Sequence, residues 1–212
     1  ETLASGSCCY SIVNRTVVFP DTNFPIPDLA GNATISMQKA TGARFHQLPM
    51  GQRIKKKPTV YIETTIPSYL TARPSTNIDN LYRQLKTQDW WNNILPRVDP
   101  VISEYVVKEA GAGDPLFAKI RLTALQVARM LALTDEIAVG ARELQHRLNI
   151  PHRARFDAFH LAFSIIYQVD YLLSWNFEHL VGAPVKRVFM DIGQELEMKM
   201  PVLCTPEELM EV

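Results

Sequence analysis

Short apolar runs and longer amphipathic stretches alternate from residue 58 to the end of the chain. The apolar runs are rich in β-branched and aromatic side chains and predict four strands: Thr59–Ile62, Pro100–Ile102, Tyr171–Ser174 and Pro201–Cys204. Stretches with helical periodicity fill the intervals between them. Strands that are separated by helices need crossover connections. The pattern therefore predicts an α/β fold, a three-layer α/β/α sandwich with a mainly parallel central sheet.

The helices are predicted from apolar residues that recur at helical spacing. The apolar stripes consist of Ile78, Leu81, Tyr82 and Leu85; of Leu116, Ile120, Ala124, Val127 and Leu131; and of Ile137, Ala141, Leu144 and Leu148, and a further helix covers about 153–168. Asn77 and Ser103 are expected to cap helices, and Thr205 with Glu208 forms a capping box. The segment Glu63–Pro67 is expected to be a loop.

Residues 1–57 differ in character from the rest and are predicted to be an N-terminal extension, with the folded domain at 58–212. They contain four prolines, among them Pro20, Pro25 and Pro27, and no run of sustained helical or strand periodicity. Met50 directly precedes the first convincing strand. This position favours a translation start assigned too far upstream, so that residues 1–49 are not native. A genuine disordered or loosely docked arm is the alternative.

Charge adds one constraint on function. The chain has 212 residues with 22 Lys and Arg against 22 Asp and Glu, so its formal net charge is zero. Proteins that bind nucleic acid over a broad surface usually carry an excess of basic residues, because phosphate contacts dominate that affinity. The balance favours a local site, with a metal ion supplying positive charge, over a broad basic platform.

Cysteine usage and hydropathy favour a cytoplasmic protein. Cys8, Cys9 and Cys204 show no metal-binding spacing, and adjacent cysteines rarely form a disulfide with each other. A reduced compartment is therefore expected. The most apolar stretch, 159–175, is interrupted by polar residues and predicts a buried helix and strand instead of a membrane span.

Four polar residues are expected at the carboxyl edge of the sheet, where α/β folds bind ligands. Glu63 follows the first strand, Glu109 lies on the helix after the second, Asp157 begins the helix near residue 153, and Asn176 follows the strand Tyr171–Ser174. Carboxylates that lie close together in a poorly solvated site need a compensating charge. Oxygen ligands suit Mg²⁺ or Mn²⁺, which can promote attack on a phosphodiester.

Each of these residues also has an ordinary structural interpretation. Glu63 and Glu109, taken singly, are typical solvated surface charges. Asp157 can be an acid at a helix N-terminus, and Asn176 can begin a turn. His160 is expected to be packed or hydrogen-bonded and not a ligand. The pair Trp90–Trp91 is expected to pack in the core, although two adjacent rings can also stack on bases.

Four motifs occur in an order that resembles a known family. They are Thr59–Leu70 (TVYIETTIPSYL), Ser103-x-x-Val106-x-x-Glu109, Asp157–Ala162 (DAFHLA) and Leu172–Leu180 (LLSWNFEHL), followed by the tail Pro201–Leu209. Together they resemble the PIN domain, in the subgroup of VapC-like toxins of type II toxin–antitoxin systems that carries the YIET motif. The resemblance covers about 58–210.

This resemblance implies a Rossmann-like domain that binds Mg²⁺ or Mn²⁺ and cleaves RNA, with a cognate antitoxin as partner and a homodimer as the usual assembly. The metal-binding acids would be Glu63, Glu109 and Asp157. Asn176 would take the fourth acidic position and orient a water, and Ser174 would help to position the phosphate. Glu63 replaces a more common Asp, and Asn176 replaces an acid. The second change favours one metal ion or low activity.

Two other functions compete with a ribonuclease. A catalytically weak or inactive PIN fold that binds RNA or protein is the alternative, because of Glu63 and Asn176. A phosphatase or nucleotide-dependent enzyme is disfavoured, since the sequence has no glycine-rich phosphate loop and no Asp-x-Asp after the first strand.

Overall fold

The computed structural model describes residues 12–13, 16–17 and 56–210. The chain divides into two units, Glu1–Gly51 and Gln52–Val212. In the first unit, β1 (Ile12–Val13) pairs antiparallel with β2 (Thr16–Val17). The other predictions made for residues 1–55 lie outside the described residues. The division into an extension and a domain at residue 58 stays a prediction.

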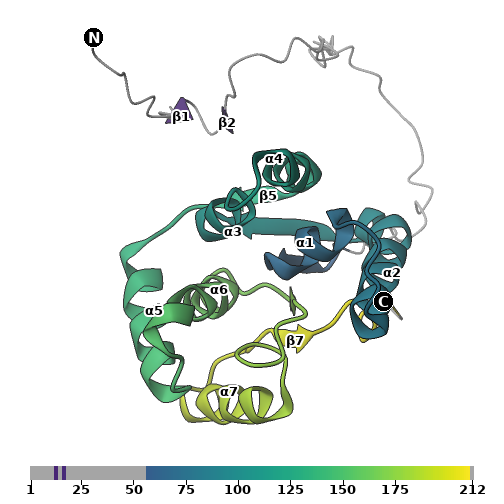
Figure 1. Cartoon of the computed structure of the whole chain (residues 1–212). Coiled ribbons are helices and arrows are strands. Elements are labelled where there is room, and N and C mark those ends of the chain that lie inside the picture. The colour runs from purple at the N-terminus through teal and green to yellow at the C-terminus, as the bar shows by residue number, and fades with distance from the viewer. Residues whose placement is uncertain (1–11, 14–15, 18–55, 211–212) are drawn as a thin grey trace, which may run out of the picture. The chain divides into compact units, whose positions relative to one another are not determined.

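The second unit is built on a five-stranded parallel sheet with the order β5-β4-β3-β6-β7 (Figure 1). Its strands are β3 (Thr59–Ile62), β4 (Asp99–Ser103), β5 (Arg129–Leu131), β6 (Tyr171–Leu173) and β7 (Val202–Cys204). The central strand β3 pairs with both β4 and β6. Val60, Tyr61 and Ile62 are fully buried on it, as expected for a strand covered on both faces.

Helices cover both faces of this sheet. They are α1 (Thr65–Thr71), α2 (Ile78–Asn93), α3 (Glu104–Ala110), α4 (Pro115–Ala124), α5 (Asp135–Arg147), α6 (Arg155–Ile166) and α7 (Ala183–Glu195), with short 3₁₀ turns at Leu95–Arg97, Leu125–Val127 and His152–Ala154. Right-handed crossovers place α1 to α4 on one face and α5 to α7 on the other (Figure 1). The predicted three-layer α/β fold with a parallel sheet is confirmed. None of the described helices is long and apolar enough to cross a membrane.

One predicted helix is too long, and the strand that follows it was missed. The stripe from Leu116 to Leu131 reads as one helix, but α4 ends at Ala124 and β5 begins at Arg129. Leu131 is buried in that strand, whereas Leu116 is 62% exposed. The apolar residues keep helical spacing beyond the end of α4 by chance. Pairing of β5 with β4, a long-range contact, decides the structure there.

Helix starts were predicted with mixed success. Asn77 caps α2 by accepting from the Asn80 backbone. Thr205 and Glu208 exchange capping-box hydrogen bonds around a turn. Ser103 occupies the N-cap position of α3 without capping it, because its hydroxyl bonds Tyr61 instead.

The prediction of a loop at Glu63–Pro67 is wrong, because α1 begins at Thr65. Pro67 is tolerated in the first turn of α1 because a backbone N–H at that position would have no acceptor within the helix.

The apolar stripe that predicted α2 does not face the core. Ile78 is 79% exposed, and Tyr82 and Leu85 are exposed as well. The buried side of α2 carries Trp90 with Gln84 and Thr87. Trp90 packs in the core, as expected, and has no exposed surface for stacking on a base.

Candidate metal centre

The candidate site lies at the carboxyl edge of three neighbouring strands. Ser103 is the last residue of β4, Glu63 directly follows β3, and Ser174 directly follows β6. Because these strands are parallel and adjacent, their ends bring the three side chains to one edge of the sheet. Of the four predicted polar residues, Glu63 has the predicted location because of this topology.

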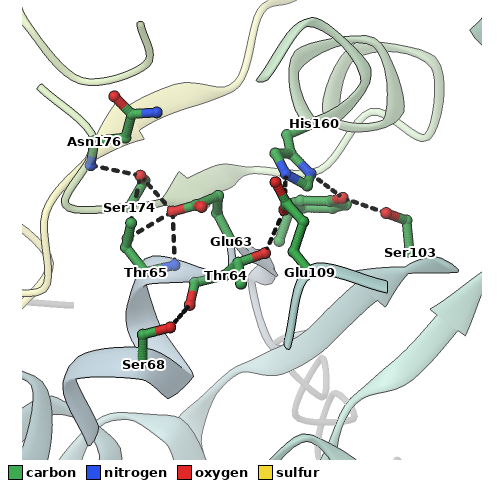
Figure 2. A network of polar contacts seen from close by, with 10 residues as sticks. Glu63, Thr64, Thr65, Ser68, Ser103, Glu109, His160, Ser174 and Asn176 are labelled. Atoms are coloured by element: carbon green, nitrogen blue, oxygen red, sulfur yellow. Dashed lines mark hydrogen bonds and ion pairs between the residues drawn. The ribbon is translucent and has the colours of Figure 1, made fainter. Parts of the chain in front are cut away.

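Glu63 is held by one of its two carboxylate oxygens. It is 4% exposed, and its Oε2 accepts hydrogen bonds from the Thr65 backbone N–H (3.1 Å), the Thr65 hydroxyl (2.5 Å) and the Ser174 hydroxyl (2.7 Å). Figure 2 shows these contacts around the start of α1. From the described residues, no hydrogen bond reaches Oε1. The carboxylate is thus fixed in orientation with one oxygen left for a ligand.

Glu109, on α3, has the same arrangement. Its Oε2 accepts from the Thr64 hydroxyl at 2.6 Å and from His160 Nε2 at 2.9 Å, while Oε1 receives no hydrogen bond from the described residues. Burial alone would raise the pKa of Glu109, but the hydrogen bond and charge of His160, with the Thr64 bond, outweigh it and lower the pKa. Glu109 is therefore a carboxylate at neutral pH.

His160 donates to Glu109 whichever protonation state it has. Its Nδ1 lies 2.9 Å from the Tyr61 hydroxyl, which lies 2.6 Å from the Ser103 hydroxyl. A carboxylate only accepts, so Nε2 must carry a hydrogen toward Glu109. In the neutral ring, Nδ1 then accepts from Tyr61, which accepts from Ser103. His160 is thus hydrogen-bonded, as expected, and its Nε2 lone pair is not available to a metal ion.

The pKa values of this buried chain follow from its surroundings. Burial lowers the pKa of His160, but the hydrogen bond to Glu109 and the charges of Glu109, Glu63 and Asp157 outweigh it and raise the pKa. Burial raises the pKa of Tyr61 well above its usual range. Tyr61 therefore stays a neutral hydroxyl that can both donate and accept.

Asp157 lies on the first turn of α6 and is buried. Burial raises its pKa to about 6, and the charge of Glu63 acts in the same direction, whereas His160, His179 and Asn176 oppose the shift. The coupling to Glu63 shows that the two acids share one electrostatic environment. A positive charge placed between them would relieve this repulsion.

Asn176 supports the loop after β6 with its side chain. Its backbone N–H donates to the Ser174 hydroxyl at 2.9 Å, and its Oδ1 accepts from the His179 backbone at 3.0 Å. The side-chain oxygen expected to orient a water therefore bonds the backbone here. Its catalytic role stays a prediction.

The donor set fits one divalent cation. Ligand atoms of Glu63, Glu109 and His160 all lie within 4.8 Å of one another, the one such group found in the described residues, and Asp157 is not part of it. His160 is committed to Glu109, so Glu63 and Glu109 are the available ligands of this group. Each presents an oxygen without a donor, which suits a hard cation such as Mg²⁺ or Mn²⁺. The assignment of Glu63, Glu109 and Asp157 as metal ligands stays a prediction.

Three residues of the site, Tyr61, Thr64 and Thr65, were not predicted from the sequence. Ser103 was predicted only as a helix cap. The two threonines that follow Glu63 directly were a usable signal, because hydroxyls beside a buried acid can saturate one of its oxygens. Tyr61 gave no such signal, since a tyrosine in an apolar strand is typical core.

A cavity of about 490 Å³ lies at the opposite, amino edge of the strands, where Thr59 and Asp99 are among its lining residues. The ion pairs Arg129–Asp99 and Lys199–Asp170 neutralise charges along this cavity. Glu63 and Asp157, two buried acids that form no ion pair among the described residues, are expected at the carboxyl edge, so that edge and not this cavity is the candidate site.

No family model and no curated protein sequence matches the chain. Several solved structures resemble it, two of which are as follows. One is VapBC2 from Rickettsia felis bound to a DNA fragment from their promoter, with 14% identity over 69% of this chain and 98% of the other and a TM-score of 0.41. The other is a toxin–antitoxin complex from Klebsiella pneumoniae, with 18% identity over 59% and 93% and a TM-score of 0.43. The YIET subgroup stays a prediction.

Proposed function

We propose that the chain is a metal-dependent endoribonuclease of the VapC-like PIN type, the toxin of a type II toxin–antitoxin module. The observation that carries this proposal is the pair of carboxylates Glu63, which is buried, and Glu109, which is partly buried. Each has one saturated oxygen and one oxygen without a donor, at the carboxyl edge of a parallel sheet. The four ordered sequence motifs support the same proposal.

The ion, Mg²⁺ or Mn²⁺, would be held by Glu63, Glu109 and Asp157, and when bound it supplies positive charge next to the phosphodiester. The chain's own residues orient these acids. Thr65 and Ser174 fix Glu63, and Thr64 and His160 fix Glu109. Because the fixed hydroxyl and imidazole donors occupy Oε2 of each glutamate, both carboxylates keep one orientation without the ion.

Asp157 is the candidate base. A carboxyl with a pKa of about 6 exchanges its proton near neutral pH, whereas the carboxyl of Glu109 stays ionised. Asp157 would therefore accept the proton of the attacking water at its carboxylate and would contact the ion through a water, because a direct contact would lower this pKa. The different pKa values of Asp157 and Glu109 thus favour Asp157 as the base and Glu109 as a ligand of the ion.

A PIN fold that binds RNA or protein without turnover is the second candidate. It is favoured by Asn176, an amide at the fourth acidic position, whose side-chain oxygen accepts from the His179 backbone. In that case RNA would be retained and no metal-dependent cleavage would be seen.

The proposed partners are RNA, a cognate antitoxin and a second copy of the chain. Exposed apolar side chains on α2 and α4, such as Ile78, Leu85 and Leu116, offer surface for a protein partner. The cytoplasm is the proposed location, and the buried Cys204, a free thiol, is compatible with its reducing conditions.

The direct test incubates the purified chain with RNA in Mn²⁺, in Mg²⁺ and in EDTA. Glu63→Gln and Asp157→Asn should each reduce cleavage at least a hundredfold, and EDTA should abolish it. Glu104→Gln is the matched control, because Glu104 is an exposed acid on the same helix as Glu109. Cleavage that is equal in wild type, Asp157→Asn and EDTA would refute the proposal.

Metal binding is measured separately by calorimetric titration of Mn²⁺ into the chain without RNA. Glu109→Gln should weaken the binding at least tenfold, and Glu104→Gln should not change it. Tight Mn²⁺ binding without cleavage would support the second candidate.

A further inference from the structure

Arg83, on α2, lies among three aromatic rings. Its Cζ is 5.9 Å from the ring centroid of Tyr69, 5.9 Å from that of Trp175 and 5.3 Å from that of Phe177. Its Nη1 donates to the Tyr69 hydroxyl at 3.0 Å. Cation–π contacts of this kind hold a guanidinium in place without neutralising its charge.

The charge of Arg83 has no carboxylate partner in the part of the chain that the structure describes. Other arginines there, Arg129 and Arg147, each form ion pairs with acids. A guanidinium has five N–H donors in a planar fork, and Arg83 uses one of them on the Tyr69 hydroxyl. The remaining donors match the oxygens of a phosphate, which guanidinium groups bind in a bidentate manner.

Phe177 exposes an aromatic surface beside this cation. Its side chain is 48% exposed, whereas Trp175 next to it is buried. The two rings are 6.3 Å apart with an interplanar angle of 41°, so Trp175 supports Phe177 from the core side. A half-exposed ring on a fixed support is the kind of platform on which bases of single-stranded nucleic acid stack.

This cluster is physically continuous with the acidic residues. The Trp175 backbone N–H donates to the Thr65 hydroxyl at 2.8 Å, and the same hydroxyl donates to Glu63 Oε2 at 2.5 Å. Ser174, which also holds Glu63, lies in the same short segment as Phe177. A single-stranded nucleic acid bound to Arg83 and Phe177 would therefore be positioned next to the carboxylates.

We propose that Arg83 and Phe177 form a subsite for single-stranded RNA, in which Phe177 stacks on a base and Arg83 donates to a backbone phosphate. The inference rests on the proposed function, because it names how the substrate of that site is held. It also explains how a chain of zero net charge binds a polyanion: the cation is local and stands beside the acids. A duplex is not expected to bind, since its bases are not free to stack on a side chain.

The test measures binding in EDTA, so that no cleavage is needed. A fluorescein-labelled single-stranded RNA of mixed sequence is titrated with the full chain, and anisotropy is followed at several salt concentrations. Phe177→Leu and Arg83→Gln should each weaken binding about tenfold, the effect of losing one base stack or one charged contact. Arg83→Gln should also reduce the slope of log K against log salt by about 0.7, as expected for one phosphate on a single strand. Phe177→Leu should leave the slope unchanged.

Arg73→Gln is the matched control, because Arg73 also lies over a phenylalanine ring, 5.2 Å from the centroid of Phe117, outside the proposed subsite. It removes the same charge and should change binding less than twofold. A purely structural role of Arg83 would alter affinity without the change in salt slope. The same salt slope for Arg83→Gln and wild type would therefore overturn the inference, as would an equal loss in Arg73→Gln or absence of binding by wild type.

Single-stranded DNA and duplex RNA of the same sequence serve as competing ligands. Preference for the duplex would also overturn the inference. Failure of the proposed function is distinguishable from these outcomes: RNA would then bind through Arg83 and Phe177 in EDTA, but metal ions would produce no cleavage.

Discussion

Replacing Tyr61 by phenylalanine removes one buried hydroxyl and leaves the shape of the ring unchanged. That hydroxyl lies 2.6 Å from Ser103 Oγ and 2.9 Å from His160 Nδ1, and all three residues have no exposed surface. No water is expected to replace it, because phenylalanine fills the same space. Two buried polar atoms therefore lose a partner at once.

Each buried polar atom left without a partner costs about 1–3 kcal/mol. With Ser103 Oγ and His160 Nδ1 both left without this partner, the expected loss in the free energy of unfolding is about 2–6 kcal/mol in total. Tyr167→Phe is the control: this hydroxyl donates to the Ala132 carbonyl at 2.9 Å, but the side chain is 37% exposed. Water can satisfy that carbonyl, and the loss should stay below about 1 kcal/mol.

Urea unfolding in EDTA, followed by circular dichroism, measures both variants, and an unchanged slope against urea shows that the unfolded state is the same. The double variant Tyr61→Phe/Ser103→Ala should recover part of the loss, because it removes one of the two unsatisfied atoms. An equal loss in Tyr61→Phe and Tyr167→Phe would refute the reasoning. So would a double variant less stable than Tyr61→Phe alone.

Three further predictions concern other parts of the molecule. The pKa of Asp157 is raised to about 6, so its carboxyl stabilises the fold below about pH 4, and this contribution is lost as the pH rises through 6. In EDTA at pH 7, Asp157→Asn should therefore be more stable by up to about 3 kcal/mol in urea unfolding, with no difference below pH 4. Burial raises the pKa of the Cys204 thiol to about 12. In a Cys8→Ser/Cys9→Ser variant, Cys204 should therefore react with a thiol reagent only after unfolding. Rapid reaction of the native protein would contradict the burial of Cys204. A Cβ at Gly182 would lie 2.1 Å from the Phe177 carbonyl oxygen, whereas one at Gly140 would meet nothing closer than 3.7 Å. Gly182→Ala should therefore lose about 1–3 kcal/mol, and Gly140→Ala, inside α5, should lose nothing, as thermal unfolding of both variants can verify.

The carboxyl-edge position of the acids could be predicted because it depends on local pattern. The strand Thr59–Ile62 is recognisable from its own side chains, and whatever follows it must lie at the end of the strand. The same holds for Asn176 after β6. Where pattern and structure diverged, as between Leu116 and Leu131, a strand of three residues was too short to show its own periodicity.

The sequence by itself determined the fold class, the central strand and the position of Glu63 at the end of that strand, because periodicity and strand ends are properties of neighbouring residues. Only the tertiary structure decided what those residues can do. Ser174 holds Glu63 from 111 positions away, and His160 holds Glu109 from 51 positions away. Such distant contacts decide which oxygen of each glutamate is saturated and which way His160 donates, and they leave Arg83 without an ion pair among the described residues. A pattern of neighbouring residues contains no information about them.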